Sequence, residues 1–150
     1  MASTYSTNLR IELMADGENS NTWGGKTNTN LNLLEQAVSG VASVAMTDAD
    51  YTLTTSNAAT DEARNAVITM TGTLTQARNV IVPSVDKVYI FKNSTTGGFG
   101  IVVKTSAGTG VTIPNGETAQ LYCDATNVGL AETGGATTAI LVGGGVGSLP

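Results

Sequence analysis

Histidine is missing from this 150-residue sequence, and cysteine occurs only once, at position 123. Without His, the chain lacks the commonest general base and the commonest transition-metal ligand. No Ser-His-Asp, Cys-His or zinc-finger arrangement is therefore available, and we expect neither a metal nor a cofactor. Cys123 has no partner for an intrachain disulfide, and its flanking residues Leu-Tyr and Asp predict a buried strand position.

Charged residues are also scarce, at 13% of the chain, and acidic side chains outnumber basic ones by 12 to 7. Phosphate binding draws its affinity from clustered Lys and Arg, so seven scattered cations argue against a nucleic-acid partner. No run of 18 apolar residues occurs, which argues against membrane insertion, and the first residues do not resemble a secretory signal. The polar positions are filled mainly by Thr, Asn, Ser and Gly.

The remaining groups offer little catalytic chemistry. A hydrolase that uses only carboxylates, such as Asp61 and Glu62, is the one credible enzyme alternative. Ser84 and Lys87 have the serine-lysine spacing of penicillin-recognising enzymes, but they follow Pro83 between two predicted strands rather than opening a helix. Asp48 and Asp50 are more typical of a turn before a strand than of a catalytic pair. We therefore expect a protein that is not an enzyme.

The first 40 residues predict an extended arm followed by a short helix. Residues 1–26 show little periodicity, and this arm contains the only Trp within a run of Asn, Thr and Gly. Residues 27–40 predict a helix with N-cap groups at 27–29 and a stop at Gly40. Its apolar stripe consists of Leu31, Leu34, Ala37, Val38 and Val41. The stripe either forms a threefold seam between copies or packs on the chain's own sheet.

Residues 41–142 change to the period of β-strands. The segments rich in Val, Ile, Thr and aromatics are 51–55, 66–75, 79–82, 87–92, 99–105, 110–113, 118–123 and 136–142. Gly- and Pro-containing turns separate them, so we predict a mainly β protein whose antiparallel strands form a sandwich or jelly-roll-like domain. Residues 143–150 are a Gly-rich tail.

Two stretches resemble a known family. Residues 17–24 (GENSNTWG), with TNTNL at 27–31 and LEQA at 34–37, resemble the N-terminal region of tail-fibre and related virion structural proteins of tailed bacteriophages. The β segments from Tyr51 to Asp124 resemble the domain that accompanies it. The resemblance implies a virion protein, commonly a homotrimer, whose N-terminal part attaches to the particle, and it brings no catalytic residues.

The resemblance leaves the location in the particle open. A tail fibre or adaptor is the first interpretation, and a capsid decoration or head-fibre protein is the alternative. A carbohydrate-binding adhesin module that contacts a host surface glycan is a further alternative, although most aromatic residues fall within predicted strands.

The candidate docking and assembly residues lie in the arm and the helix. Trp23 offers a large amphipathic contact, the Asn side chains offer hydrogen bonds, and the glycines allow close approach of the chain. The candidates are Asn19, Trp23, Gly24, Asn28, Asn30, Leu31, Leu34 and Val38. The competing interpretation is that Trp23 covers the protein's own sheet.

Overall fold

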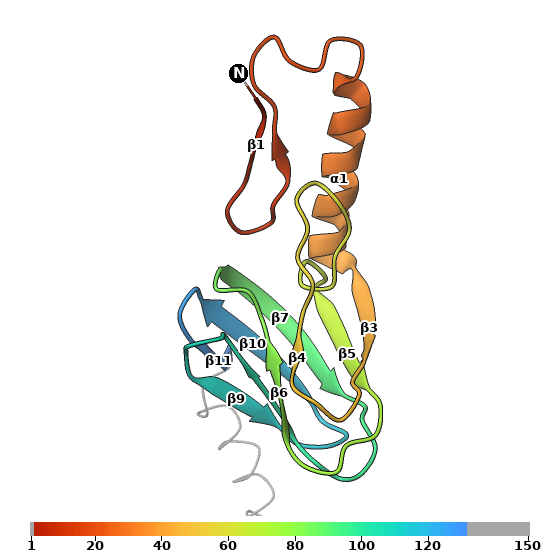
Figure 1. Cartoon of the computed structure of the whole chain (residues 1–150), viewed down its shortest axis with the longest axis vertical. Helices are drawn as coiled ribbons and strands as arrows, with labels where there is room; N and C mark the ends of the chain where they lie inside the picture. The colour runs from red at the N-terminus through yellow and green to blue at the C-terminus, as the bar shows by residue number, and fades with distance from the viewer. Residues whose placement is uncertain (1, 132–150) are drawn as a thin grey trace, which may run out of the picture.

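The computed structural model describes residues 2–131 and is mainly β, with one helix above two mixed sheets (Figure 1). An N-terminal layer contains the hairpin strands β1 (Thr4–Tyr5) and β2 (Glu12–Leu13) and the helix α1 (Trp23–Ser39). The β-domain below it contains β3 (Val41–Ala45), β4 (Tyr51–Thr52), β5 (Val67–Thr71), β6 (Arg78–Ile81), β7 (Asp86–Asn93), β8 (Ile101–Lys104), β9 (Gly110–Ile113), β10 (Thr118–Asp124) and β11 (Val128–Leu130). The predicted strand at 136–142 and the tail at 143–150 lie outside the described residues.

Two sheets build the β-domain, with the orders β11-β10-β7-β5-β3 and β4-β6-β8-β9. From β3 to β8 the chain alternates between the sheets, and each strand lies parallel to the previous strand of its own sheet. This part of the chain therefore winds as successive turns of a flattened helix. The later strands β9, β10 and β11 pair antiparallel and extend the sheets beyond β8 and β7.

The mainly β prediction is confirmed, but the antiparallel assignment is wrong for the strands from β3 to β8. Gly72, which lies within the predicted strand segment 66–75, and Gly97, at a predicted turn between neighbouring strands, instead follow β5 and β7 at corners where the chain crosses to the other sheet. Both glycines have φ above 100°, which favours glycine, and the corners stack through a parallel bridge between Thr73 and Thr96. Local periodicity identifies strands, but it does not identify their partners.

One hydrophobic core receives side chains from both sheets. Ile68, Met70, Tyr89, Phe91, Leu121 and Cys123 come from the five-stranded sheet, and Val80, Ile101, Val103 and Ile113 come from the four-stranded sheet. These side chains are at most 1% exposed, and each contributes about 1.5 to 3 kcal/mol if its apolar surface is fully removed from water. Cys123 is buried, as the sequence predicts, and burial raises the pKa of its thiol.

The helix begins at Trp23 rather than at residue 27, so the predicted N-cap residues 27–29 lie inside it. The backbone carbonyl of Asn19 accepts hydrogen bonds from the N–H groups of Thr22 and Trp23, which satisfies donors at the helix start without a side-chain cap. The other end agrees with the prediction. Gly40 follows the last helical residue, has an extended backbone, and donates its N–H to Gln36.

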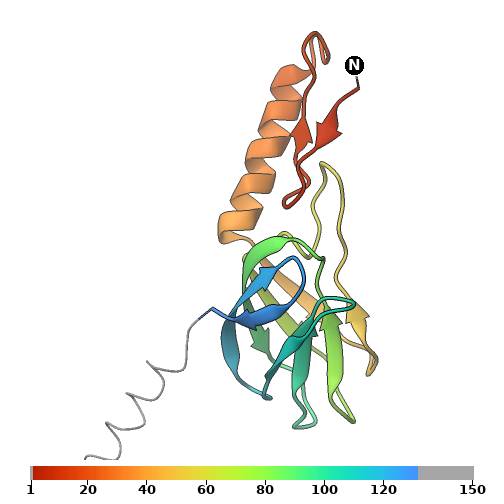
Figure 2. The same cartoon turned by 90° about the vertical axis from the view of Figure 1, so that its left-hand side faces the viewer.

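The predicted extended arm is instead folded into a short hairpin beside the helix (Figure 2). Thr4 pairs with Leu13 and Tyr5 with Glu12. In β2, Leu13 is exposed and Glu12 is the buried residue. The hairpin thus buries polar groups against α1, a pattern that hydrophobic periodicity does not reveal.

Candidate functional site

Polar contacts hold the hairpin against one face of α1. The Asn30 side chain accepts a hydrogen bond from the Glu12 N–H at 3.0 Å and donates one to the Glu12 carbonyl at 2.8 Å. Lys26, one helical turn earlier, forms an ion pair of 2.9 Å with the Glu12 carboxylate, which is 6% exposed. The pairing with Lys26 lowers the pKa of Glu12. These contacts occupy the face of α1 that carries Lys26 and Asn30.

Arg64 joins the N-terminal layer to the β-domain from a fully buried position. Its guanidinium donates to the carbonyl of Leu9 in the hairpin loop at 2.8 Å and to the Gln36 side chain of α1 at 3.3 Å. It also donates to the carbonyls of Ser56 and Ala59 and forms an ion pair of 3.2 Å with Asp61. Desolvation lowers the pKa of Arg64. Hairpin, helix and the 55–64 loop therefore share one hydrogen-bond network.

A second face of α1 carries exposed apolar side chains. Leu31 is 57% exposed, Leu34 is 37% exposed and Val38 is 80% exposed, whereas the neighbouring Leu33 is buried. We call Leu31, Leu34 and Val38 the α1 seam. Their spacing of three and then four residues is the spacing of coiled-coil core positions, and Val41 continues it beyond Gly40. The alternative in which the stripe packs on the chain's own sheet does not hold for these three residues, because they are exposed.

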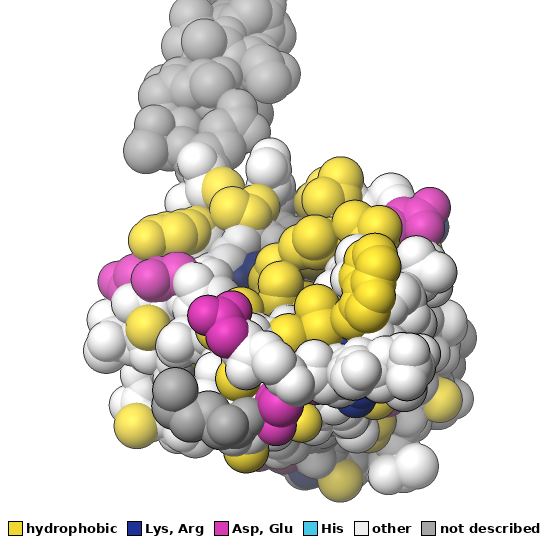
Figure 3. Space-filling view, turned by 90° about the horizontal axis from the view of Figure 1, so that it is seen from above, with side chains coloured by type: hydrophobic (Ala, Val, Ile, Leu, Met, Phe, Trp, Pro, Cys, Tyr) yellow, Lys and Arg dark blue, Asp and Glu magenta, His cyan; other side chains and the backbone are white. Residues whose placement is uncertain are grey.

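The N-terminal end of the molecule carries another apolar group. Tyr5, Leu13 and Met14 belong to the hairpin and the residue after it, and Trp23 is the first residue of α1. Trp23 is 64% exposed, so it does not cover the protein's own sheet. Figure 3 looks down on this end and shows hydrophobic side chains gathered where the hairpin and the helix lie.

The predicted docking residues divide between external and internal positions. Trp23, Asn28, Leu31, Leu34 and Val38 are exposed on α1. Gly24 lies in the first turn, where an added Cβ would meet no atom within 4 Å. Asn30 is engaged by Glu12, and Asn19 has a left-handed backbone with φ of 61° that turns the chain into the helix. The structure thus places five of the eight residues in exposed positions.

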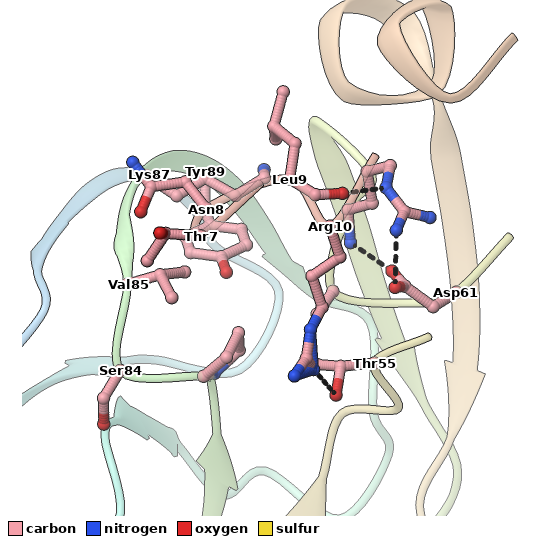
Figure 4. A pocket seen from close by; sticks show the side chains of 13 residues that line it. Thr7, Asn8, Leu9, Arg10, Thr55, Asp61, Ser84, Val85, Lys87 and Tyr89 are labelled. Atoms are coloured by element: carbon pink, nitrogen blue, oxygen red, sulfur yellow. Dashed lines mark hydrogen bonds and ion pairs between the residues drawn. The ribbon is translucent and has the colours of Figure 1, made fainter. Parts of the chain in front are cut away.

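A pocket of about 220 Å³ lies under the hairpin loop, between residues 7–10 and the start of β7 (Figure 4). The Tyr89 hydroxyl points into it, is fully buried, and has no hydrogen-bond partner among the described residues. Burial raises the pKa of Tyr89 and lowers that of Lys87 to about 8. The Lys87 ammonium donates to the carbonyls of Asn65 and Val88 and lies 4.0 Å from the centre of the Tyr89 ring.

Ser84 and Lys87 have the sequence spacing of a serine-lysine pair, but their side chains do not come together at this pocket. Figure 4 shows the Ser84 hydroxyl pointing away from Lys87. No hydrogen bond joins the two side chains. Ser84 therefore lacks a base in this arrangement.

The carboxylates considered for hydrolysis hold loops together. Asp61 accepts from the N–H groups of Ser56 and Arg64, and Glu62 accepts from the Tyr51 hydroxyl and the Thr54 N–H. Asp48 accepts from Thr75 and Arg78, and Asp50 accepts from Asn79. Asp48 and Asp50 lie at a bend directly before β4, as predicted, and their side chains connect it to residues before and within β6.

Sequence reasoning missed Arg64 and Glu12, two buried charged residues that hold the N-terminal layer in place. A run of Asp-Glu-Ala-Arg at 61–64 carries no periodic signal that distinguishes a buried Arg from a surface one. Within residues 2–131, no three His, Cys, Asp or Glu side chains are placed to hold a metal, and no helix is long and apolar enough to cross a membrane.

Comparison of the chain with protein-family models, with curated proteins and with solved structures found no match. The candidate site has two parts, the α1 seam and the apolar N-terminal end.

Proposed function

We propose that this protein is a non-enzymatic structural component of a bacteriophage virion. It associates with copies of itself through α1, as a homotrimer, and its N-terminal layer attaches it to the particle in the manner of a tail fibre or adaptor. In this proposal the two sheets around one core are a sandwich-type body that the N-terminal layer carries.

The exposed α1 seam is the observation that carries this proposal. The hairpin and the Arg64 network fix the opposite part of the helix, so α1 is held in place while Leu31, Leu34 and Val38 face outward. Coiled-coil spacing favours another helix with the same spacing as the partner. Within the described residues α1 is the only helix, so a second copy supplies that partner.

The apolar N-terminal end supports attachment. Trp23 is a large, exposed amphipathic side chain of the kind that is enriched at interfaces. Asn28 lies on the same helix and is exposed to solvent. Trp23 therefore serves as an anchor for a partner of the particle. The resemblance of residues 17–37 to virion proteins of tailed phages supports a partner within the phage particle.

The attachment is tested in purified phage particles. A phage that lacks this gene is complemented with the wild-type protein, with Trp23→Ala, or with Phe99→Ala. Phe99 is the matched control because it is an exposed aromatic residue in the loop between β7 and β8, in the β-domain. We expect wild-type and Phe99→Ala protein in particles and a several-fold loss for folded Trp23→Ala.

Two results would contradict the proposal. Absence of the wild-type protein from purified particles removes the virion role. Equal incorporation of Trp23→Ala and Phe99→Ala leaves the virion role standing but shows that the N-terminal end is not the attachment surface.

A further inference from the structure

The outer face of the five-stranded sheet carries an apolar patch at the end nearest α1. Val41 of β3 lies opposite Val67 of β5, which lies opposite Ile90 of β7. In the adjacent row, Val88 of β7 lies opposite Tyr122 of β10. Because side chains alternate along a strand, all five project from the face that does not line the core. We call Val41, Val67, Val88, Ile90 and Tyr122 the outer-sheet patch.

Four of the five patch side chains are well exposed to solvent although they are largely apolar. Val41 is 68% exposed, Val88 is 50% exposed and Tyr122 is 46% exposed, and Ile90 is 36% exposed. The next row of the same face, away from the helix, is polar and consists of Ser43, Thr69, Lys92 and Thr118. On the half nearer the helix, the apolar residues share the face with Gln120, opposite Ile90, and with the pair Asp86 and Asp124 beyond Val88 and Tyr122. Contiguous exposed apolar surface of this kind marks interaction sites on soluble proteins.

The α1 seam and the outer-sheet patch adjoin each other along the chain, and the residues at the junction, Val38 and Val41, are both exposed. Val38 ends the seam, Gly40 follows the helix, and Val41 begins both β3 and the patch (Figure 1). Gly40 donates its N–H to Gln36 in α1, and its carbonyl accepts from the Val67 N–H in β5. A side chain at Gly40 would overlap the Gln36 carbonyl oxygen and the Asn65 amide oxygen. This close junction fixes the helix relative to the sheet.

The seam alone is small for a stable assembly. Leu31 and Val38 are seven residues apart, which corresponds to roughly 11 Å of helix. Stable protein interfaces bury about 1,200 to 2,000 Å² in total, far more than three aliphatic side chains from each copy provide. The outer-sheet patch supplies the missing apolar area next to the seam.

We propose that the outer-sheet patch is the second half of the self-association surface and is covered by a second copy of this chain. The inference rests on the proposed function, because the α1 seam brings the copies together. When seams of symmetric copies meet, the rigid junction at Gly40 carries the adjoining sheets toward the same axis. The patch of one copy is then buried against its neighbour, while the polar row remains in water.

The test measures the equilibrium constant for self-association of the full chain by sedimentation equilibrium across a concentration series. The patch variant is Val88→Thr with Ile90→Thr, because Thr keeps the branched shape and strand preference at exposed positions. The control is Lys92→Thr, on the same strand and the same face but in the polar row. Far-ultraviolet circular dichroism during heating verifies that each variant is folded.

We expect the patch variant to dissociate at concentrations at least tenfold higher than the wild type, and the control to change by less than threefold. An oligomeric wild type with unchanged association in the patch variant overturns this inference and leaves the seam proposal intact. A wild type that stays monomeric throughout the series overturns both. A third outcome separates the two surfaces. If the double variant Leu31→Ser with Val38→Ser still associates while the patch variant does not, the patch is supported and the seam is contradicted.

Discussion

The side-chain amide of Asn30 forms two hydrogen bonds with the backbone of Glu12, at 3.0 and 2.8 Å. The amide offers one acceptor and one donor to a strand, as the peptide group of a neighbouring strand does. A helix thereby takes the place of a third strand beside the hairpin. The hairpin is too short to be stable alone, so its position depends on this contact, on the Lys26 ion pair and on Arg64.

Replacing Asn30 by Ala is expected to release the hairpin. The change leaves the N–H and carbonyl of Glu12 without partners at a part-buried position, which costs about 1 to 3 kcal/mol of unfolding free energy. Urea unfolding measures the loss, and hydrogen exchange at Glu12 localises it. Asn28→Ala is the control, because Asn28 is exposed on the same helix. Equal stability of the two variants would show that the amide contact does not hold the hairpin.

Gly40 and Gly25 provide a matched pair of substitutions. Alanine at Gly40 places its Cβ against the Gln36 carbonyl oxygen and the Asn65 side chain, an overlap that costs about 1 to 3 kcal/mol. Alanine at Gly25 meets no atom within 4 Å and raises helix propensity by about 1 kcal/mol. Thermal unfolding should therefore shift in opposite directions. A neutral Gly40→Ala would mean that the junction between α1 and β3 is looser than described.

Arg64 is expected to be intolerant even of lysine. Arg64→Lys cannot reproduce donation to Leu9, Gln36 and the loop carbonyls, and it leaves the buried Asp61 with a poorer partner. Removing one partner of a buried ion pair costs about 3 to 5 kcal/mol, and we expect the lysine variant, which keeps the charge, to lose part of that. The comparison variant is Arg10→Lys, whose only side-chain hydrogen bond among the described residues goes to the hydroxyl of Thr55. Chemical unfolding that finds the two variants equally stable would contradict the network's role.

The hydrogen bonds of Asp48 are expected to make part of the free energy of unfolding depend on pH in the acidic range. Hydrogen bonds from the Thr75 hydroxyl and N–H and from Arg78 lower the pKa of Asp48 to about 2. Because the folded pKa lies below the unfolded value of about 3.9, this contribution is complete above pH 4 and is lost as the pH falls toward 2. Unfolding measured between pH 5 and pH 2 should lose less stability in Asp48→Asn than in the wild type. The control is Asp16→Asn, at an exposed position; parallel pH profiles for wild type and Asp48→Asn would contradict the assignment.

The sequence was informative where the structure is set by neighbouring residues. The strand at Gly110–Ile113 has the predicted bounds, Gly40 ends the helix as predicted, and Cys123 is buried. In each case a local signal is sufficient, because alternation marks the strand and glycine marks the helix end. The apolar stripe of α1 was also visible, but its spacing is the same whether it faces a sister helix or the protein's own sheet.

The rest depends on contacts between distant residues. The parallel pairing of β3, β5 and β7 joins segments separated by a strand of the other sheet, and no local pattern encodes that choice. The early helix start depends on Asn19 and on the hairpin, although Gly24 and Gly25 have low helix propensity. Arg64 donates a hydrogen bond to the carbonyl of Leu9, which is far away in the sequence, so its role can be recognised only from the folded structure.

The most direct measurement of the central claim is the solution mass of the purified full chain by sedimentation equilibrium, compared with that of Leu31→Ser with Val38→Ser. The account predicts a mass near three times 15.2 kDa for the wild type and a shift toward the monomer for the seam variant, without loss of the folded β-domain. A wild-type chain that remains at 15.2 kDa at every concentration would contradict self-association through α1.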